Sequence, residues 1–431
     1  ALEYAGEHIG GALWQYFEGQ GDAERALAAM KDASRYTRGH LSRDAVHALY
    51  GGAVTLSASR MDMARSCHFA YFMRYGLKAR ERTGAGFDAP QIGTFVHDVM
   101  EHTLRQAKEC GGLHTLSKDK LHALVRASIE EYIDRVLPDL CEKSARFRYL
   151  FNRLCATVER IMDEVSEELQ SSDFEPLAFE LAFGADGQLP AITIREENGT
   201  ARVVGKVDRV DGWLHDGKLY LRVVDYKTGK KSFDLAELRY GLGLQMLLYL
   251  FTLKEEGQML FGGHEIVPAG VLYTPAREPM LRCARDTAPE KIEKARKKEL
   301  RRSGMVLEDP AVLQAMEHSA LTSPCYLPIA VKKDGAVTGS LASAEQLGKL
   351  SKYVDRLLHE ITQEVFAGNI DADPYARTPQ LSACTYCEFA NACHFENGCG
   401  SDRMEYIKAT KNDEFWQHID EVNGKEARSD G

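Results

Sequence analysis

The sequence predicts an α/β protein with a mixed central sheet flanked by helices. Three kinds of observation indicate this fold class: a strand–turn–strand pattern, further apolar strand patterns, and long stretches with helical periodicity. The strand–turn–strand pattern occupies residues 203–227, and the further strand patterns occupy residues 174–183 and 268–275. Helical periodicity extends over residues 117–170, 233–254 and 344–367. Strands and helices that share one chain in this way are typical of α/β domains. With 431 residues, the chain can bury a large core in one big domain or two modest ones.

Residues 203–227 are the stretch around which the rest of the chain is organised. β-Branched residues fill the first strand, and the pairs Asp211-Gly212 and Asp216-Gly217 are expected to bracket the turn. The second strand, residues 219–224, is almost continuously apolar, which is typical of a buried central strand. Charged residues at the end of such a strand do not stabilise an apolar core, because burying a charge costs free energy unless it is paired.

Asp225 and Lys227 nevertheless end the second strand. Because side chains alternate along a strand, both point to the same face, and Asp208 lies at a similar depth on the neighbouring strand. Two carboxylates can hold a divalent metal, and a lysine beside them can orient or deprotonate a water. The alternative is a buried Asp–Lys ion pair at the end of a hairpin, since structural ion pairs also cluster in this way.

The remaining segments give weaker signals. Residues 1–50 read as helices, and the polar residues 409–431 are expected to form a disordered tail. His97 lies on the apolar face of a predicted helix, where a lone histidine is usually an ordinary interior residue. Glu180 is an acidic residue in an otherwise apolar strand, and it either lies close to a metal or faces solvent. Gln245 and Tyr249 are four residues apart and therefore project from one helix face.

Charge and targeting patterns limit the function classes. The net charge of −10, from 54 basic and 64 acidic residues, argues against a protein that coats nucleic acid over its whole surface. No apolar run approaches membrane-spanning length, and residues 1–15 lack the pattern of a secretory signal. We therefore expect a cytoplasmic protein that does not contact a membrane. The chain lacks an initiator Met, and we expect it to be a piece of a larger protein.

Four of the ten cysteines crowd together near the C-terminus, at Cys384, Cys387, Cys393 and Cys399. In a chain without an export signal, such crowding favours a metal or cluster over disulfides. Sequence proximity alone indicates a compact zinc site made of these four, because closing short loops costs little entropy. An iron–sulfur cluster would also take four thiolates. Cys67 lies in an aromatic helical phrase, where a cysteine is more often a buried thiol than a ligand.

Two sets of phrases carry a family resemblance. Asp208, a hairpin and then Asp225-Tyr226-Lys227 resemble the D…(D/E)xK pattern of the PD-(D/E)XK nuclease superfamily, and the surrounding GKVDRVD and DYKTG phrases resemble its RecB-type branch. The phrase around Cys67, with Phe69, Tyr71, Phe72 and Tyr75, resembles the start of the nuclease domain in AddB subunits of bacterial helicase–nucleases. The resemblance covers roughly residues 56–405.

The resemblance implies a PD-(D/E)XK core that cleaves single-stranded DNA with Mg²⁺ or Mn²⁺. Asp208, Asp225 and Lys227 would be catalytic, and His97 and the Tyr226 carbonyl would be further metal ligands. Gln245 and Tyr249 would line the strand channel, and Glu180 would be a carboxylate near the metal. The densest basic run, residues 291–302, is then the best candidate for phosphate contacts, through Arg296, Lys297 and Lys298, although such runs are usually only solvated faces.

The resemblance also resolves the cysteines differently from their spacing. It implies a structural [4Fe–4S] cluster on Cys67, Cys384, Cys387 and Cys393 that staples the two ends of the fold together and leaves Cys399 free. The expected organisation is residues 1–50 as the last helices of a helicase-like region, residues 51–408 as the nuclease domain, and residues 409–431 as the tail. The expected role is double-strand-break processing and recombinational repair, together with an AddA-type helicase–nuclease subunit.

Two alternatives stay open at this point. The chain could be a non-catalytic module that holds DNA and contains a purely structural metal cluster, but Asp208, Asp225 and Lys227 together argue against this. It could also be a small cluster-bearing exonuclease of the CRISPR-associated type, although the chain is long for that class. The phosphate-binding phrase G-x-x-x-x-G-K-[ST] is absent from the sequence, so this chain supplies no ATP-binding loop of that kind.

Overall fold

The computed structural model describes residues 1–34, 37–80, 89–184 and 187–429. Its centre is a six-stranded sheet with the order β11-β8-β7-β6-β5-β2. The pairs β6·β7 and β8·β11 are parallel, while β2·β5, β5·β6 and β7·β8 are antiparallel, so the expected mixed sheet is confirmed. The strands are β2 (Glu175–Phe183), β5 (Gly205–His215), β6 (Lys218–Lys227), β7 (Glu265–Pro275), β8 (Ser303–Leu307) and β11 (Leu341–Ala342).

The β5–β6 hairpin forms as its sequence indicates, with one difference. Asp216 and Gly217 make the turn with φ of 49° and 77°, a left-handed backbone that matches the twist of a two-residue hairpin. Asp211-Gly212, expected to bracket this turn, lies inside β5, where Asp211 pairs with Arg222 and Gly212 with Leu221. The prediction that Asp211-Gly212 flanks the turn is therefore wrong. The pair continues the strand because Asp211 has a buried partner, Arg222, on β6.

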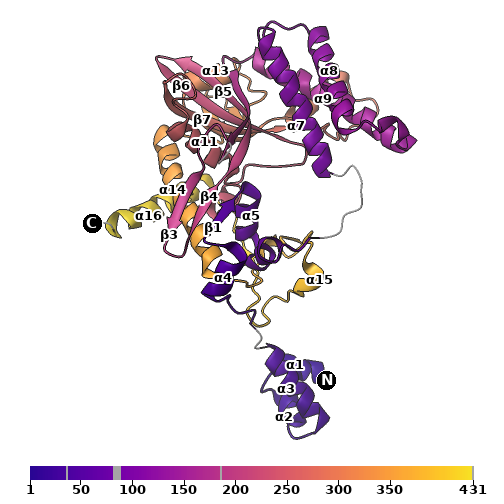
Figure 1. The fold of residues 1–431 in the computed structure, drawn as a ribbon, viewed down its shortest axis with the longest axis vertical. Helices are drawn as coiled ribbons and strands as arrows, with labels where there is room; N and C mark the ends of the chain where they lie inside the picture. Colours follow the sequence, from indigo (N-terminus) through magenta and orange to yellow (C-terminus); the bar gives the residue numbers. More distant parts are fainter. Residues whose placement is uncertain (35–36, 81–88, 185–186, 430–431) are drawn as a thin grey trace.

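Helices pack on both sides of this sheet and extend beyond it (Figure 1). The helices α7, α8 and α9 form a bundle at one side, and α11 packs against β6 and β7. Pro138 lies in the interruption between α8 and α9. The bounds are α7 (Ala89–Glu109), α8 (Lys118–Val136), α9 (Ala145–Gln170), α10 (Leu235–Arg239), α11 (Gln245–Glu256), α12 (Pro289–Glu299), α13 (Pro310–Met316) and α14 (Ala344–Ala367).

A second, three-stranded sheet joins the main sheet to the N-terminal part of the chain. Its order is β1-β4-β3, and β4 continues through Val204 into β5, so one extended run serves both sheets. The helix α14 packs against β3 and β4, and α5 follows β1 and carries the chain to Cys67. The bounds are β1 (Ala53–Leu56), β3 (Ile192–Glu196), β4 (Gly199–Val203) and α5 (Ala58–Ser66).

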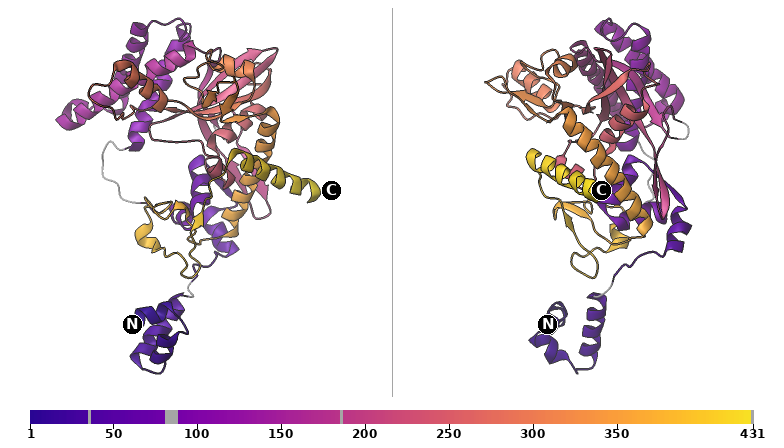
Figure 2. Two further views of the ribbon diagram at one scale, coloured as in Figure 1. Left: turned by 180° about the vertical axis from the view of Figure 1, so that it is seen from behind. Right: turned by 90° about the vertical axis from the view of Figure 1, so that its left-hand side faces the viewer.

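The N-terminal helices divide into two parts. The helices α1 (Leu2–Glu7), α2 (Ala12–Phe17) and α3 (Asp22–Ser34) gather around their own small apolar cluster, which includes Trp14 and Leu27. This unit lies apart from the rest of the molecule in all three ribbon views (Figures 1 and 2). The helix α4 (Arg43–Tyr50), in contrast, buries Val46 in the main core.

The C-terminal region contains the crowded cysteines and a final helix. The segment with the cysteines consists of short elements: β12 (Tyr375–Thr378), β13 (Leu381–Ser382), α15 (Ala390–Cys393) and β14 (Glu405–Tyr406). Two elements that follow Cys67 in the N-terminal half are equally short: α6 (His68–Tyr71) and the π-helical turn Phe72–Gly76. Upstream of the C-terminal region, β9 (Ile329–Val331) and β10 (Val337–Gly339) form a short antiparallel hairpin. A 3₁₀ turn, Leu140–Glu142, lies between α8 and α9.

Two expectations about helices are wrong. The single helix predicted over residues 233–254 is broken between α10 and α11, where Gly241 and Gly243 take φ of 78° and 68°, which no right-handed helix contains. The expected disordered tail is the helix α16 (Asn412–Ser429), which packs on α14. Phe415 and Ile419 of this helix are fully buried. They are four residues apart and form an apolar stripe on one helix face, which the polar composition of the segment as a whole does not reveal.

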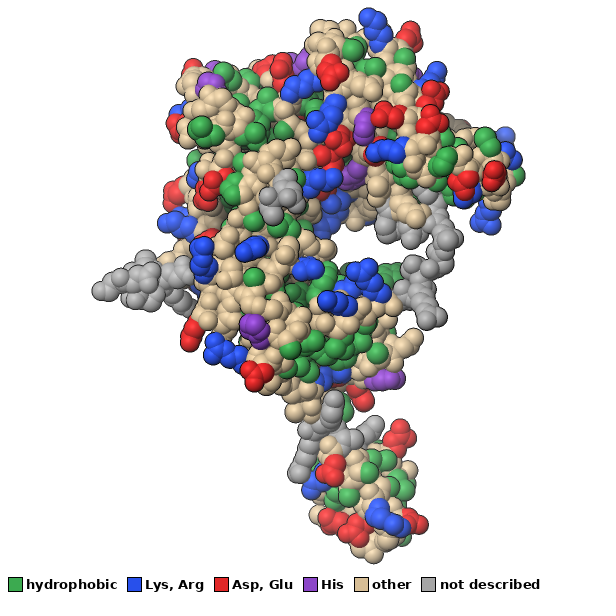
Figure 3. Space-filling model, in the orientation of Figure 1, with side chains coloured by type: hydrophobic (Ala, Val, Ile, Leu, Met, Phe, Trp, Pro, Cys, Tyr) green, Lys and Arg blue, Asp and Glu red, His purple; other side chains and the backbone are tan. Residues whose placement is uncertain are grey.

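Surface charge is mixed. On the face seen in Figure 3, Lys and Arg side chains are interspersed with Asp and Glu and do not form one continuous basic surface over the described residues. This agrees with the net negative charge of the chain. Among the helices that the structure describes, none is long and apolar enough to cross a membrane.

Candidate metal centre and cysteine cavity

The hairpin brings Asp208, Asp225 and Lys227 together at one end of the sheet. The β5–β6 register pairs Arg209 with Val224, and its continuation puts Asp208 opposite Asp225. Opposed residues of an antiparallel pair point to the same face, as predicted. Lys227 Nζ lies 2.6 Å from Asp225 Oδ2, and the backbone N–H of Tyr226 donates to Asp208 Oδ2 at 2.9 Å.

His97 reaches this group from α7. Its Nδ1 lies 3.3 Å from Asp208 Oδ2, and its Nε2 donates to the Tyr226 carbonyl oxygen at 2.8 Å. Burial lowers the pKa of His97, but the hydrogen bond and charge of Asp208 outweigh burial and raise that pKa to about 9. The imidazole thus contacts two of the three protein groups that were predicted to share a metal with it, Asp208 and the Tyr226 carbonyl.

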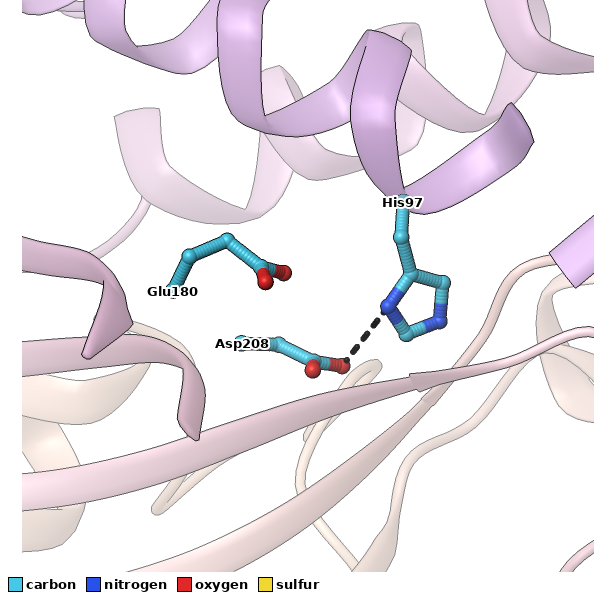
Figure 4. Close-up of side chains that lie close together, drawn as sticks. All are labelled: His97, Glu180 and Asp208. Atoms are coloured by element: carbon cyan, nitrogen blue, oxygen red, sulfur yellow. Dashed lines mark ion pairs between the residues drawn. The ribbon is translucent and has the colours of Figure 1, made fainter. Parts of the chain in front are cut away.

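Glu180 joins the group from the edge strand β2. The β2–β5 register pairs Phe179 with Arg209 and Leu181 with Val207, so Glu180 lies opposite Asp208. Its backbone has φ of 50°, a strained value for a residue with a side chain, and such strain concentrates at functional sites. Single ligand atoms of His97, Glu180 and Asp208 all lie within 4.8 Å of one another. Figure 4 shows these three side chains gathered between α7 and the sheet. Glu180 also forms an ion pair with Lys206.

The donor set suits a hard divalent cation. Carboxylate oxygens, a backbone carbonyl and one imidazole are ligands of Mg²⁺ and Mn²⁺, and no soft thiolate is among these donors. Burial and the nearby Asp208 carboxylate raise the pKa of Asp225 to about 6, since two buried carboxylates repel each other. A divalent cation between them would relieve this repulsion. The residues present therefore fit a divalent metal.

A buried charge network lies on the opposite face of the same two strands, and sequence reasoning missed it. Asp211 accepts hydrogen bonds from Arg209 Nη2 at 3.0 Å and from Arg222 Nε at 2.8 Å, and all three residues are fully buried. Arg222 approaches Glu168 of α9 at 3.8 Å, and Glu168 Oε2 accepts from Arg302 at 2.5 and 3.1 Å. The arginines in two otherwise apolar strands were the signal that could have revealed it, because a buried charge needs a partner.

The predicted cluster cysteines line one cavity. Cys67, Cys384, Cys387 and Cys393 all border a cavity of about 670 Å³ between α5 and the C-terminal segment, together with Phe69 and Phe389. Burial raises the pKa of the Cys67 thiol to about 12. Cys399 is not among the described residues that line this cavity. The structure thus places residue 67 beside residues 384–393, which sequence proximity alone would not do.

The predicted DNA-contacting residues have mixed surroundings. Tyr249 is 3% exposed and packs edge-on against Phe183, while Gln245 is partly exposed and donates to the Tyr249 hydroxyl at 3.1 Å. In the basic helix α12, Arg296 forms ion pairs with Glu164 and Glu293, and Lys297 with Glu167. A DNA contact through this face therefore competes with acidic groups of the protein itself.

The fold and the site define the class of protein. A mixed sheet with an Asp on one strand, Asp-x-Lys on the next and a helical His is the arrangement that the hairpin phrases led us to expect. The family model described as the PD-(D/E)XK nuclease superfamily matches residues 55–394. The chain belongs to this superfamily.

Two relatives with similar sequences are longer proteins. A protein of Ruminiclostridium cellulolyticum, named as the B-type subunit of an ATP-dependent helicase/deoxyribonuclease, is 30% identical over 426 residues, which cover 96% of this chain and 37% of that protein. The protein of the same name from Acetivibrio thermocellus is 33% identical over 409 residues, which cover 94% of this chain and 35% of that protein. The chain thus spans little more than a third of the length of these curated relatives.

Proposed function

We propose that this chain is the nuclease region of a B-type subunit of an ATP-dependent helicase–deoxyribonuclease, and that it hydrolyses single-stranded DNA with Mg²⁺ or Mn²⁺. The observation that carries the proposal is the convergence of His97, Glu180 and Asp208 beside the Asp225–Lys227 pair. The names of the relatives support the helicase–nuclease context and a partner subunit, which in this proposal is of the AddA type. DNA processing for break repair and recombination would take place in the cytoplasm.

The residues divide the chemistry among themselves. Asp208 and Asp225 would hold the metal, with His97, the Tyr226 carbonyl and Glu180 as further donors. When bound, the metal would act as a Lewis acid that offsets negative charge on the phosphate. Lys227 would position the attacking water, because its ammonium group already lies against Asp225 at the edge of the site and can donate a hydrogen bond to the water oxygen. Gln245, which is partly exposed near the site, would contact the strand.

The four cavity cysteines would hold a structural [4Fe–4S] cluster. Their separation along the chain, the shared cavity and its aromatic lining support this assignment over a compact zinc site that includes Cys399. The cluster would tie α5 to the C-terminal segment. Other contacts already join these parts: the backbone N–H of His68 donates to Asp373 at 2.8 Å, and Arg65 pairs with Glu360 and Glu364 of α14.

A cleavage assay on single-stranded DNA tests the proposal. Asp208→Ala and Lys227→Ala should abolish Mg²⁺-dependent cleavage and leave the circular dichroism spectrum and DNA affinity nearly unchanged. Asp216→Asn is the matched control, since Asp216 lies in the turn at the far end of the same hairpin with an 88% exposed side chain. Cleavage at the native rate in either site variant would show that the activity arises elsewhere. An inactive native protein that still binds DNA would favour the non-catalytic alternative.

A further inference from the structure

The β5–β6 hairpin carries the candidate metal centre on one face and the buried charge network on the other, and Tyr226 contacts both. Asp208, Asp225 and Lys227 face the candidate metal centre, whereas Arg209 and Tyr226 alternate to the opposite face. There Arg209 Nη1 donates to the Tyr226 hydroxyl at 2.6 Å, and the guanidinium lies 5.5 Å from the centre of the tyrosine ring. Both side chains are buried, with exposed fractions of 0% and 4%. The contact therefore joins the immediate neighbours of all three predicted catalytic residues.

The buried network holds Arg209 firmly in place. Asp211 accepts from Arg209 on the same strand and from Arg222 on the next, and the network continues through Glu168 of α9 to Arg302. It contains three guanidinium groups and two carboxylates, which leaves one positive charge in excess. With fewer carboxylates than guanidinium groups, Arg209 also needs a neutral acceptor for its Nη1 hydrogen, because a donor left unpaired in the core costs free energy. The Tyr226 hydroxyl is that acceptor.

The backbone of Tyr226 belongs to the metal centre. Its N–H donates to Asp208 Oδ2 at 2.9 Å, and its carbonyl oxygen accepts from His97 Nε2 at 2.8 Å. Its side chain thus ends in the buried network, while both of its backbone polar groups contact predicted metal ligands. A side chain locked at one end fixes the orientation of the peptide groups at the other, and outer contacts of this kind tune metal sites.

We propose that Arg209 and the Tyr226 hydroxyl are positioning residues: their contact on the far face of the sheet orients the Tyr226 backbone and the Asp208 carboxylate for metal binding. This inference rests on the proposed metal-dependent function. It assigns a role to the arginine and the second aspartate of the Asp208-Arg209-Val210-Asp211 phrase, neither of which faces the metal centre. It also gives the tyrosine side chain between Asp225 and Lys227 a task that is separate from the ligand role of its carbonyl.

Tyr226→Phe is the sharpest test, because it removes one oxygen atom and keeps the ring. Mn²⁺ alone is titrated calorimetrically into the full chain, without DNA. The dissociation constant should rise about tenfold, the lower end of the range found when outer contacts of metal ligands are lost. Cleavage should then require a higher Mn²⁺ concentration for half-maximal rate, with the maximal rate largely recovered at saturating metal.

Tyr353→Phe is the matched control. The Tyr353 ring is also 4% exposed, and its hydroxyl donates to the Arg239 carbonyl oxygen at 2.8 Å, away from the metal centre. Tyr353→Phe removes this hydrogen bond and a longer contact of the hydroxyl with His418 Nε2 at 3.4 Å, so it should lower stability at least as much as Tyr226→Phe. Only Tyr226→Phe should weaken Mn²⁺ binding.

The outcomes separate the inference from the proposed function. Equal Mn²⁺ affinity of Tyr226→Phe and the native protein would overturn the inference, whatever the change in stability. Failure of the native protein to bind Mn²⁺ would overturn the proposed function itself. If Tyr226→Phe fails to fold while Tyr353→Phe folds, Arg209→Lys gives a second test, since lysine keeps the charge but cannot hold Asp211 and the Tyr226 hydroxyl together. A folded Arg209→Lys variant with native Mn²⁺ affinity would also overturn the inference.

Discussion

Removal of Asp211 should destabilise the protein strongly, although Asp211 faces away from the metal centre. The Asp211 side chain is fully buried and lies 2.8 Å from both Arg209 Nε and Arg222 Nε. Asp211→Ala leaves two guanidinium groups facing a cavity without this carboxylate. Glu168 could not replace it, since it lies 3.8 Å from Arg222 and already binds Arg302.

The magnitude follows from this geometry. Removing one partner of a buried ion pair typically costs about 3–5 kcal/mol, and Asp211 serves two arginines, so the upper part of this range is expected. Against the roughly 5–15 kcal/mol that stabilises a typical domain, the loss is large. Glu265→Ala is the control on the same sheet: Glu265 pairs with Lys218 at 3.1 Å, but its side chain is 65% exposed, and exposed pairs contribute about 0–1 kcal/mol.

Urea unfolding, followed by circular dichroism, measures both changes. The midpoint of Asp211→Ala should fall far below that of the native protein, while Glu265→Ala should unfold close to the native midpoint. If the two variants unfold at similar midpoints, the network does not carry the free energy assigned to it here. A stronger version of the test replaces Arg209, Asp211 and Arg222 together by apolar residues of similar size. This triple variant should be more stable than Asp211→Ala, because no charge is then left without a partner on these two strands.

Four further outcomes are expected. Cys67→Ser should lose iron and thermal stability in protein purified without oxygen, whereas Cys399→Ser should keep both; iron analysis decides, and colourless native protein with stoichiometric zinc would contradict the cluster assignment. Gly205→Ala should lower the melting temperature at a cost of about 1–3 kcal/mol, since the new Cβ would lie 2.6 Å from Tyr249 Cε1; an unchanged melting temperature would show that the ring moves freely. Mn²⁺ affinity should fall as pH drops through about 6, because the raised pKa of Asp225 lets protons compete with the metal there; a flat calorimetric profile from pH 7 to 5 would exclude Asp225 as a ligand. Lys298→Glu should reduce the log–log salt slope of single-strand binding by about 0.7; an identical slope would leave α12 as a solvated face.

The parts of the site that could be predicted from sequence are those whose geometry depends on residues close together in the chain. Asp208, Asp225 and Lys227 belong to one hairpin, so strand alternation and a two-residue turn already bring them to one face. The family resemblance added His97, whose helix carries no other functional signal in its sequence. The grouping of these side chains in the structure agrees with the interpretation of the hairpin, while their catalytic roles stay predictions.

The parts that could not be predicted depend on contacts between distant segments. For Glu180, the residue pattern left open whether the side chain lies near a metal or faces solvent, and only the family resemblance favoured the metal. The register of β2 on β5 and a left-handed backbone decide its position, and an apolar strand pattern reveals neither. The partners of Arg209 and Arg222 come in part from α9, which is remote in sequence. The helix break at Gly241 and Gly243 and the packing of α16 on α14 have the same origin, because tertiary contacts decided between conformations that local propensity left close in free energy.

The cysteine cavity also has a consequence for the order in which the chain can mature. Its walls come from residues 59–70 and 372–395, so a ribosome that adds about 5–20 residues per second completes the second wall tens of seconds after the first has emerged. During this interval the Cys67 thiol and the apolar side of α5 have no C-terminal segment to cover them. Any group that the cavity takes up must then enter after most of the sheet has been synthesised. A cluster of the proposed kind could accordingly be completed only after residues 384–393 have been synthesised, and carriers that act on the nascent chain would meet Cys67 before the other three cysteines of the cavity.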